Sequence, residues 1–292
     1  MTLPGAEAAL RSSGHRAMSV DEARSLRALI QEHCGLAFGE DLTYLLESRL
    51  GPLLARHGLA DFAAYHRLLR GGDAGSLELE AAIEALATHE TYLFREPHQL
   101  RAFAEELLPE LADRNRRQRR LRVWSAGCST GEEAYTVAAL LLGTGLFGGW
   151  EVDVLGTDLV RGVVDVARAG VYGPGAFREA EAEALRPWFR AEGARWRVRD
   201  ELRRVVRFAR QNLLDEGATS LVDPVDVVFC RNVLIHFEAG ARRRALRTFA
   251  RKLRPGGYLL LGHAESLRLV PDGLERVQLR SDIVYRKPAR PA

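Results

Sequence analysis

Hydrophobic and polar positions follow two different patterns along the chain. Up to about residue 86, apolar residues recur every three or four positions, which is typical of amphipathic helices. The first helix is expected after Ser19, because Ser19 and Glu22 have the spacing of a capping box ahead of Leu26 and Ile30. Further helices are expected at residues 42–54, 61–69 and 77–86. The sequence therefore predicts a small all-α domain over residues 1–88.

From Leu121 onward, short valine-rich runs alternate with helical segments. Strands are expected at residues 121–124, 152–156, 205–209, 225–230 and 258–261, and helices at 132–142, 160–168 and 239–253. This alternation predicts an α/β domain with a mostly parallel sheet covered on both faces. Residues 276–279 and 283–286 flank a short turn and predict an antiparallel hairpin that closes the sheet. Ligands of such folds bind at the carboxyl ends of the strands.

The segment Ser125–Thr136 joins the first strand to a helix and has the composition of a ligand-binding turn. Gly127 and Gly131 can adopt positive φ, and the helix that follows offers unpaired N–H groups in its first turn. Neither the dinucleotide pattern G-x-G-x-x-G nor the phosphate-loop pattern is present, and the adjacent carboxylates of Glu132 and Glu133 would repel a bare phosphate. The segment favours a cationic, nucleoside-like cofactor such as S-adenosylmethionine.

Polar residues follow three of the expected strands, so they should gather at one edge of the sheet. Asp158 is placed to accept both ribose hydroxyls of a nucleoside, or alternatively to cap the next helix. Asn212 is placed beside an adenine edge, or alternatively in a turn. Arg231 precedes Asn232 at the end of a buried strand, where its charge is costly unless it meets a carboxylate.

Composition bounds the remaining possibilities. The chain has 292 residues, 47% of them apolar, and a net charge of +3, which fits one or two soluble domains. Three widely spaced cysteines support neither a disulfide framework nor a zinc site, so no metal is expected. No signal pattern or membrane-spanning apolar stretch is present, which predicts a cytoplasmic protein. The arginine-rich run at residues 114–120 is interpreted as a solvated connector, with a nucleic-acid patch as the alternative.

Six segments in order resemble one protein family, the CheR-type chemoreceptor glutamate methyltransferases. They lie at residues 88–96, 125–136, 156–158, 212–214, 230–235 and 262–265, and the resemblance runs from about residue 20 to 287. It implies an S-adenosylmethionine-dependent, Rossmann-like methyltransferase domain with a C-terminal antiparallel hairpin, preceded by the small helical domain. The expected boundaries are residues 1–88 for the helical domain, 89–120 for a linker and connecting helix, and 121–292 for the methyltransferase domain, with an inserted subdomain at about 171–200.

The resemblance also implies a function and a set of site residues. The function is methyl esterification of glutamate side chains on the cytoplasmic helices of chemotaxis receptors. Residues implied to bind S-adenosylmethionine are His89, Thr91, Arg95, Ala126, Glu132, Asp158, Asn212, Leu213, Arg231 and Asn232. Arg95 and His236 are implied to be catalytic. The chain departs from the family at His89, often asparagine, at Leu93, often phenylalanine, and at His236, often tyrosine; a histidine can still donate a hydrogen bond.

The implied chemistry needs few specialised groups. A glutamate carboxylate with a pKa of about 4.3 is already ionised at neutral pH and needs no general base. Arg95 is expected to orient either the methionine carboxylate of the cofactor or the acceptor carboxylate, with the first role favoured. His263 and Glu265 need no catalytic role, and Arg49 and Arg56 are candidates for gripping an acidic receptor helix.

Two alternatives and one negative prediction stay open. An RNA methyltransferase would use the arginine run, but Cys230–Asn232 matches neither the adenine-N6 nor the cytosine-C5 motif. A non-catalytic, cofactor-binding adaptor would keep the adenosine site and lose the acceptor site, as the change at His236 suggests. The compact turn Arg190–Ala194 lacks an extra glycine-rich loop, so binding of a tethering peptide from the receptor tail is not expected.

Overall fold

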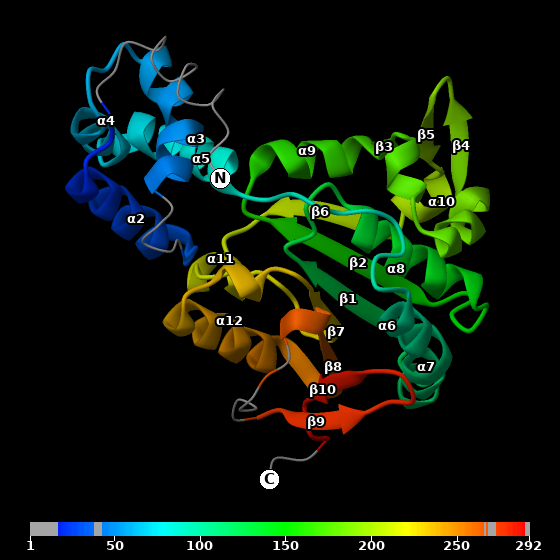
Figure 1. Cartoon of the computed structure of the whole chain (residues 1–292). Coiled ribbons are helices and arrows are strands. Elements are labelled where there is room, and N and C mark those ends of the chain that lie inside the picture. The colour runs from blue at the N-terminus through cyan, green and yellow to red at the C-terminus, as the bar shows by residue number, and fades with distance from the viewer. Residues whose placement is uncertain (1–16, 38–42, 266, 268–272, 290–292) are drawn as a thin grey trace. The chain divides into compact units, whose positions relative to one another are not determined.

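The chain folds into two compact units, Met1–Thr88 and His89–Ala292. The computed structural model describes residues 17–37, 43–265, 267 and 273–289 (Figure 1). Leu42, the first residue of the second expected helix, lies outside these ranges. Within them, no helix is long and apolar enough to cross a membrane, and no three or more His, Cys, Asp or Glu side chains are grouped as metal ligands.

The first unit is helical, as predicted. Its helices are α2 (Val20–Cys34), α3 (Thr43–Arg56), α4 (Phe62–Leu69) and α5 (Gly72–Leu86). The predicted capping box is present, because Ser19 accepts from the Glu22 N–H and Glu22 accepts from the Ser19 N–H. Helix α5 begins at Gly72 rather than at Leu77. The fully buried side chains include Leu26, Ile30, Leu46, Leu50, Leu54, Phe62 and Tyr65.

One buried carboxylate organises the polar interior of this unit. Glu78 accepts hydrogen bonds from the Tyr65 hydroxyl at 2.8 Å and from His57 Nε2 at 2.8 Å, and it forms an ion pair with Arg56 at 2.9 Å. Burial raises the pKa of Glu78, but these three partners outweigh burial and hold it below the ordinary value. Arg56 is therefore engaged within its own unit, whereas Arg49 is exposed on α3.

The second unit is built on a seven-stranded sheet with the order β6-β2-β1-β7-β8-β10-β9 (Figure 1). The strands are β1 (Arg120–Ala126), β2 (Glu151–Asp158), β6 (Val206–Arg210), β7 (Val225–Cys230), β8 (Leu253–Leu261), β9 (Glu275–Gln278) and β10 (Ile283–Arg286). Strands β6, β2, β1, β7 and β8 pair in parallel, and β10 and β9 pair antiparallel at the edge. The predicted parallel sheet and closing hairpin are confirmed.

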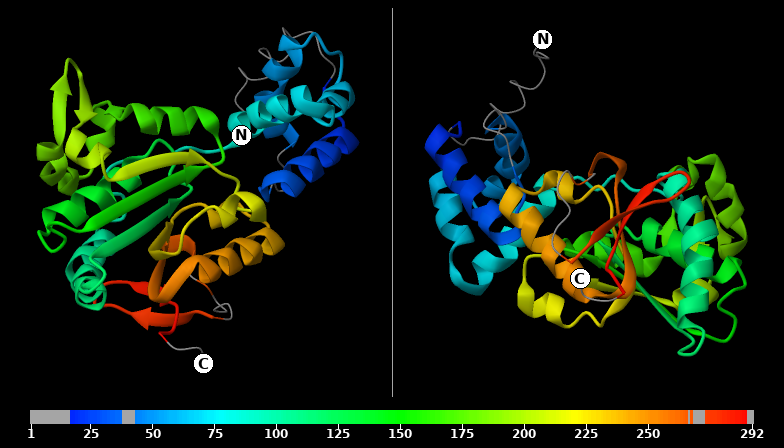
Figure 2. Two further views of the ribbon diagram at one scale, coloured as in Figure 1. Left: turned by 180° about the vertical axis from the view of Figure 1, so that it is seen from behind. Right: turned by 90° about the horizontal axis from the view of Figure 1, so that it is seen from below.

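Helices cover both faces of this sheet (Figure 2). They are α6 (Pro97–Ala102), a π-helical turn (Phe103–Leu107), α7 (Leu108–Asn115), α8 (Glu132–Gly143), α9 (Arg161–Ala169), α10 (Asp200–Arg203), α11 (Glu216–Ser220) and α12 (Ala239–Lys252). Successive strand residues point to opposite faces. Val123 therefore packs in the core beneath α8, whereas Trp124 packs in the core beneath α12 against Phe249.

Two details differ from the sequence prediction. Strand β8 begins at Leu253, which pairs with Val225, and an irregularity follows before the regular pairing resumes at Tyr258.

The interpretation of residues 114–120 as a solvated connector is wrong at its start. Asn115 is buried and donates to the Asp226 carboxylate at 2.9 Å, and Arg114 pairs with the same carboxylate at 3.2 Å. These contacts with Asp226 connect α7 to β7.

A small subdomain is inserted between α9 and α10. It contains a three-stranded antiparallel sheet in the order β3-β5-β4, with β3 (Val171–Tyr172), β4 (Phe189–Glu192) and β5 (Arg195–Val198). Two 3₁₀ segments, Pro174–Phe177 and Ala180–Trp188, precede β4. The Leu93 N–H donates to the Ala176 carbonyl at 2.9 Å, so the subdomain supports the segment that carries Arg95.

Candidate functional site

The turn after β1 is shaped by close packing against a second loop. Gly127 has φ +83°, and a Cβ built there would lie 2.4 Å from a methyl group of Val233. Gly131 has φ +94°, and its Cβ would lie 2.8 Å from the side chain of Ala167. Both positions therefore require glycine for two reasons, backbone conformation and space. The turn after β1 and the loop after β7 are thus held together at the carboxyl edge of the sheet.

Asp158 ties the end of β2 to this turn. Its carboxylate accepts from the Ser129 N–H at 2.8 Å and from the Val160 N–H at 3.1 Å. Burial raises the pKa of Asp158, and these two N–H groups oppose the rise. The N-cap residue of α9 is Val160 and not Asp158, so Asp158 does not take the capping role that was the alternative. Each carboxylate oxygen can accept a further hydrogen bond.

Arg231 is directed into the protein and supports the segment that contains Arg95. Its side chain is 2% exposed, and its Nε lies 2.6 Å from a Glu133 carboxylate oxygen. Its Nη1 donates to the Arg95 carbonyl at 2.7 Å and lies 3.8 Å from Glu96. The prediction that a buried Arg231 needs a carboxylate is confirmed. Its contacts link α8, the end of β7 and the Arg95 segment.

The backbone on both sides of Arg95 adopts an uncommon conformation. Phe94 has φ +62° and Glu96 has φ +57°, a region that non-glycine residues rarely occupy and that persists where neighbouring contacts hold it. The Phe94 N–H donates to the Thr136 hydroxyl at 3.2 Å, and Arg231 holds the carbonyl of Arg95. The Arg95 side chain is half-buried, donates to the Glu90 carbonyl, and lies 5.7 Å from the Tyr92 ring centroid.

Glu265 fixes the loop after β7, a role that was not predicted from the sequence. It is 5% exposed and accepts from four main-chain N–H groups. These belong to Asn232 at 2.7 Å, Val233 at 2.9 Å, Ile235 at 3.1 Å and Gly262 at 2.8 Å. Asn232 itself has φ +59°. This one carboxylate therefore sets the conformation of the loop that leads to His236. The signal for this role in the sequence was an acidic residue just after the last parallel strand.

Comparison with known proteins identifies the family. Residues 89–283 match the model described as "CheR methyltransferase, SAM binding domain", and residues 21–87 match "CheR methyltransferase, all-alpha domain". The chain belongs to the CheR methyltransferase family. It is 36% identical to a chemotaxis protein methyltransferase of Vibrio parahaemolyticus, covering 92% of this chain and 98% of that protein. It is 35% identical to chemotaxis protein methyltransferase 1 of Pseudomonas aeruginosa (89% and 95% covered) and 34% identical to the Escherichia coli protein (94% and 94%).

This CheR-family protein is therefore an S-adenosylmethionine-dependent methyltransferase, and the predicted fold and cofactor are confirmed. The structure offers polar atoms that fit such a ligand. In the described part of the chain, four buried side-chain atoms have no hydrogen-bond partner in the loops near the carboxyl edge: His89 Nε2, Glu96 Oε2, Ser129 Oγ and Gln211 Oε1. Buried polar atoms are normally paired, so these atoms suit a bound polar ligand. The imidazole of His89 also opposes the rise in the pKa of Asp158 that burial causes.

Three further predicted site residues lie at the start of α8 and just after β6. Glu132 is buried, accepts from the Thr130 hydroxyl at 2.7 Å, and has a pKa raised by burial. Leu213 is buried just beyond Asp158, whose carbonyl accepts from the Gln211 N–H at 2.8 Å. Asn212 accepts from the Leu214 N–H at 3.0 Å, which is the turn geometry that was its alternative.

Three other predicted residues differ in their exposure to solvent. Ala126 is buried at the end of β1, and Thr91 is half-buried between His89 and Arg95. His236 is exposed at the end of a 3₁₀ turn (Leu234–His236). Their roles in binding and catalysis stay predictions. Cys34, Cys128 and Cys230 are free and buried, as expected of packing thiols.

We expect Asp158→Ala to weaken S-adenosylmethionine binding about ten- to a hundredfold, because a charge-assisted hydrogen bond contributes about 1.5 to 3 kcal/mol. Titration calorimetry measures this directly. Asp165→Ala is the matched control, since Asp165 lies on α9 and its carboxylate pairs only with Arg168 among the described residues, at 3.0 Å. Unchanged affinity in Asp158→Ala, with an unchanged melting temperature, would remove Asp158 from the cofactor site.

Proposed function

We propose that this CheR-family protein works in the cytoplasm and transfers a methyl group from S-adenosylmethionine to glutamate carboxylates on the cytoplasmic helices of chemotaxis receptors. Such methylation adjusts receptor signalling. One observation carries the proposal: segments that carry the resemblance meet through Arg231, Glu133 and Asp158 at one edge of the sheet. The match of both domain models of the family supports it. The relatives in Vibrio, Pseudomonas and Escherichia coli are chemotaxis methyltransferases, and the similarity to this chain extends over nearly their full length.

The residues at this edge suit an alkyl transfer to an anionic oxygen. The sulfonium of the cofactor supplies an activated methyl group. A glutamate carboxylate is ionised at neutral pH and needs no base, so the protein's task is to align the acceptor and exclude water. In this proposal, Arg95 orients a carboxylate, Asp158 binds the ribose, and the buried Glu132 also contacts the cofactor.

His236 has the exposure that contact with an acceptor requires. Its backbone N–H donates to the Val233 carbonyl at 3.1 Å, so the ring position follows from the loop that Glu265 holds. An imidazole can donate a hydrogen bond to the acceptor carboxylate where relatives often have a tyrosine hydroxyl. Binding of a tethering peptide is not part of the proposal, and the prediction that no tether is needed stands as made from the sequence.

The test is methyl transfer from labelled S-adenosylmethionine to a cytoplasmic receptor fragment. We expect label in the receptor that is released as methanol by mild base, as methyl esters are, and loss of that label when the acceptor glutamates are replaced by alanine. Base-stable label or preferential labelling of RNA would contradict the proposal. Cofactor binding without transfer to any receptor fragment would instead support the adaptor alternative.

A further inference from the structure

Glu133 lies in the first turn of α8 and has two close partners of different kinds. Its Oε1 accepts from the Ser125 hydroxyl at 2.6 Å, and its Oε2 accepts from Arg231 Nε at 2.6 Å. Ser125 on β1 is fully buried, and the Glu133 side chain is 12% exposed. Both oxygens of this carboxylate therefore have a short hydrogen bond inside the protein, and the carboxylate fixes one side of Arg231.

Arg231 extends this fixed arrangement to the main chain of Arg95. While Nε donates to Glu133, Nη1 of the same guanidinium donates to the Arg95 carbonyl at 2.7 Å. A guanidinium is planar and rigid, so fixing Nε also fixes the direction in which Nη1 points. Three side chains, the Ser125–Glu133–Arg231 relay, thus lead from β1 through α8 to the backbone of Arg95.

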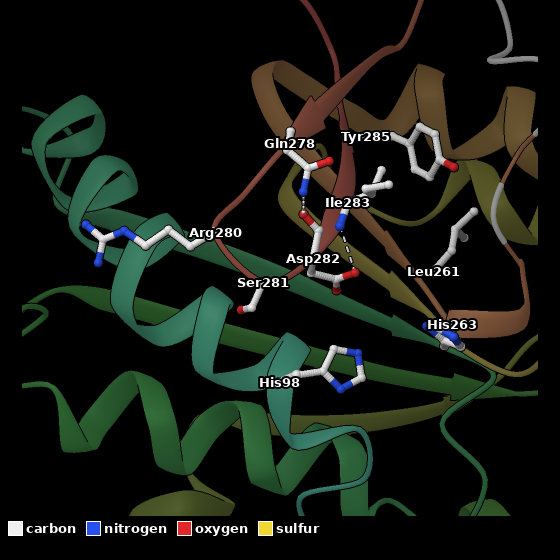
Figure 3. A pocket seen from close by; sticks show the side chains of 10 residues that line it. His98, Leu261, His263, Gln278, Arg280, Ser281, Asp282, Ile283 and Tyr285 are labelled. Carbon is white, nitrogen blue, oxygen red and sulfur yellow. Dashed lines mark hydrogen bonds between the residues drawn. The ribbon is translucent and has the colours of Figure 1, made fainter.

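The backbone around Arg95 needs contacts that hold it. Phe94 and Glu96 both have positive φ, a conformation that costs free energy and persists where the surroundings enforce it. A pocket of about 590 Å³ lies next to this segment. It is lined by His98, two residues after Glu96, and by His263, whose N–H donates to Glu96 at 3.4 Å (Figure 3). Because packing is incomplete there, the hydrogen bond from Arg231 carries much of the hold.

The charges around Arg231 show what loss of Glu133 would do. The Arg231 side chain is 2% exposed, and a buried charge needs a carboxylate. Its other carboxylate among the described residues is Glu96, 3.8 Å from Nη1, and Glu96 Oε2 has no hydrogen-bond partner there. Without Glu133, the guanidinium is drawn toward Glu96 with the same Nη1 that now holds the Arg95 carbonyl. The contact with Arg95 would then weaken.

We propose that Glu133 is a positioning residue for methyl transfer: supported by Ser125, it holds Arg231, and Arg231 sets the backbone from which the Arg95 side chain extends. The inference rests on the proposed function and on the role of Arg95 in it. Glu133 itself touches neither the cofactor nor the acceptor. Its loss should lower the rate of transfer about ten- to a hundredfold, because displacing an orienting group by about 1 Å has an effect of this size.

A double-mutant cycle on the single-turnover rate of methyl transfer to a receptor fragment tests this inference. Glu133→Ala should lower the rate about ten- to a hundredfold in the wild-type protein, but less than about twofold when Arg95 is already alanine. A residue that supports only the fold would give the same fractional loss in both backgrounds. Glu133→Gln keeps the volume and an acceptor for Arg231, so it should fold and recover part of the rate.

Asp226→Asn is the matched control for effects of stability. Asp226 is 1% exposed and pairs with Arg114 near the start of β7, whereas Arg231 follows the end of that strand. Asp226→Asn also removes the charge of a buried carboxylate that pairs with an arginine. It should lower the melting temperature and keep the rate within about twofold of wild type.

Hydrogen exchange follows the Arg95 segment without any receptor. The N–H groups of Leu93 and Phe94 are hydrogen-bonded, at 2.9 and 3.2 Å, so their exchange reports opening of this segment. In the peptide that contains them, Glu133→Ala should speed exchange about tenfold, and Asp226→Asn should leave it unchanged. This measurement decides the case even if the rate of the double variant is below detection.

Three results would overturn the inference. The first is a wild-type rate in Glu133→Ala, and the second is an equal fractional loss with and without the Arg95 side chain. The third is unchanged exchange of the Arg95 segment in a Glu133 variant that has lost activity. Failure of the proposed function looks different, because the wild-type protein would then methylate no receptor fragment while the exchange difference persisted.

Discussion

Replacing Arg95 by alanine is expected to lower methyl transfer by more than about a hundredfold and to leave the fold intact. The side chain is half-buried, and its contacts are one hydrogen bond to the Glu90 carbonyl and the face of Tyr92. Losing these contacts removes little packing. The main chain of Arg95 is held independently by Arg231, so the variant should keep its backbone conformation. Initial rates with a receptor fragment and a melting curve measure the two effects separately.

Arg178→Ala is the control that separates a role in the site from a role in packing. Arg178 stacks on the same Tyr92 ring, 3.6 Å from its centroid, and pairs with Glu90 at 2.6 Å. If Arg95 acted only by steadying Tyr92, Arg178→Ala would lose as much activity as Arg95→Ala. We expect it to retain most of the activity. Near-normal methylation by Arg95→Ala would refute the assignment.

Binding measurements on Arg95→Ala distinguish its two candidate roles. If Arg95 holds the methionine carboxylate of the cofactor, the Kd for S-adenosylmethionine should rise along with the loss of rate. If it orients the acceptor carboxylate, cofactor affinity should stay near wild type and the loss should appear with the receptor. Arg95→Lys keeps the charge without the planar fork, so partial recovery by lysine would show that charge alone supplies part of the effect.

The elements of the second unit could be predicted because each strand is a short apolar run and each helix has its own periodicity. Local signals of this kind placed Asp158 and Arg231 at strand ends, and a parallel sheet brings strand ends to one edge. Strand β8 was predicted to begin late, because Pro255, Gly256 and Gly257 read locally as a turn. The pairing of Leu253 with Val225, a contact across the sheet, overrides that local signal.

Contacts distant in sequence were the part that could not be predicted. The need of Arg231 for a carboxylate followed from the cost of burying a charge, but the identity of Glu133 as the partner depends on the packing of α8 against the sheet. Arg114 and Asn115 looked like part of an exposed basic run, although Asp226 holds both. The position of Glu265 just after the last parallel strand was a signal, but the sequence does not indicate that its carboxylate accepts from four N–H groups of two loops.

Glu265→Ala is expected to impair both stability and methyl transfer. The substitution leaves the N–H groups of Asn232, Val233, Ile235 and Gly262 without their acceptor. A buried donor without a partner costs about 1 to 3 kcal/mol, and because the loop can relax toward water we expect a total loss of about 3 kcal/mol in the free energy of unfolding. Methyl transfer should fall more than about tenfold, since the conformation of Asn232 and the position of His236 depend on this carboxylate.

Glu265→Gln tests whether the acceptor geometry, and not merely the volume of the side chain, is what matters. Glutamine has nearly the same shape, but its NH₂ group cannot accept and must face either the Gly262 and Asn232 N–H groups or the Val233 and Ile235 N–H groups. The glutamine variant should therefore lose stability and kcat in the same direction as alanine, although it fills the site. Glu275→Gln is the control, because Glu275 pairs with Arg286 on the half-exposed hairpin and touches neither loop. Wild-type melting temperature and kcat in both Glu265 variants would show that the loop holds its conformation without this carboxylate.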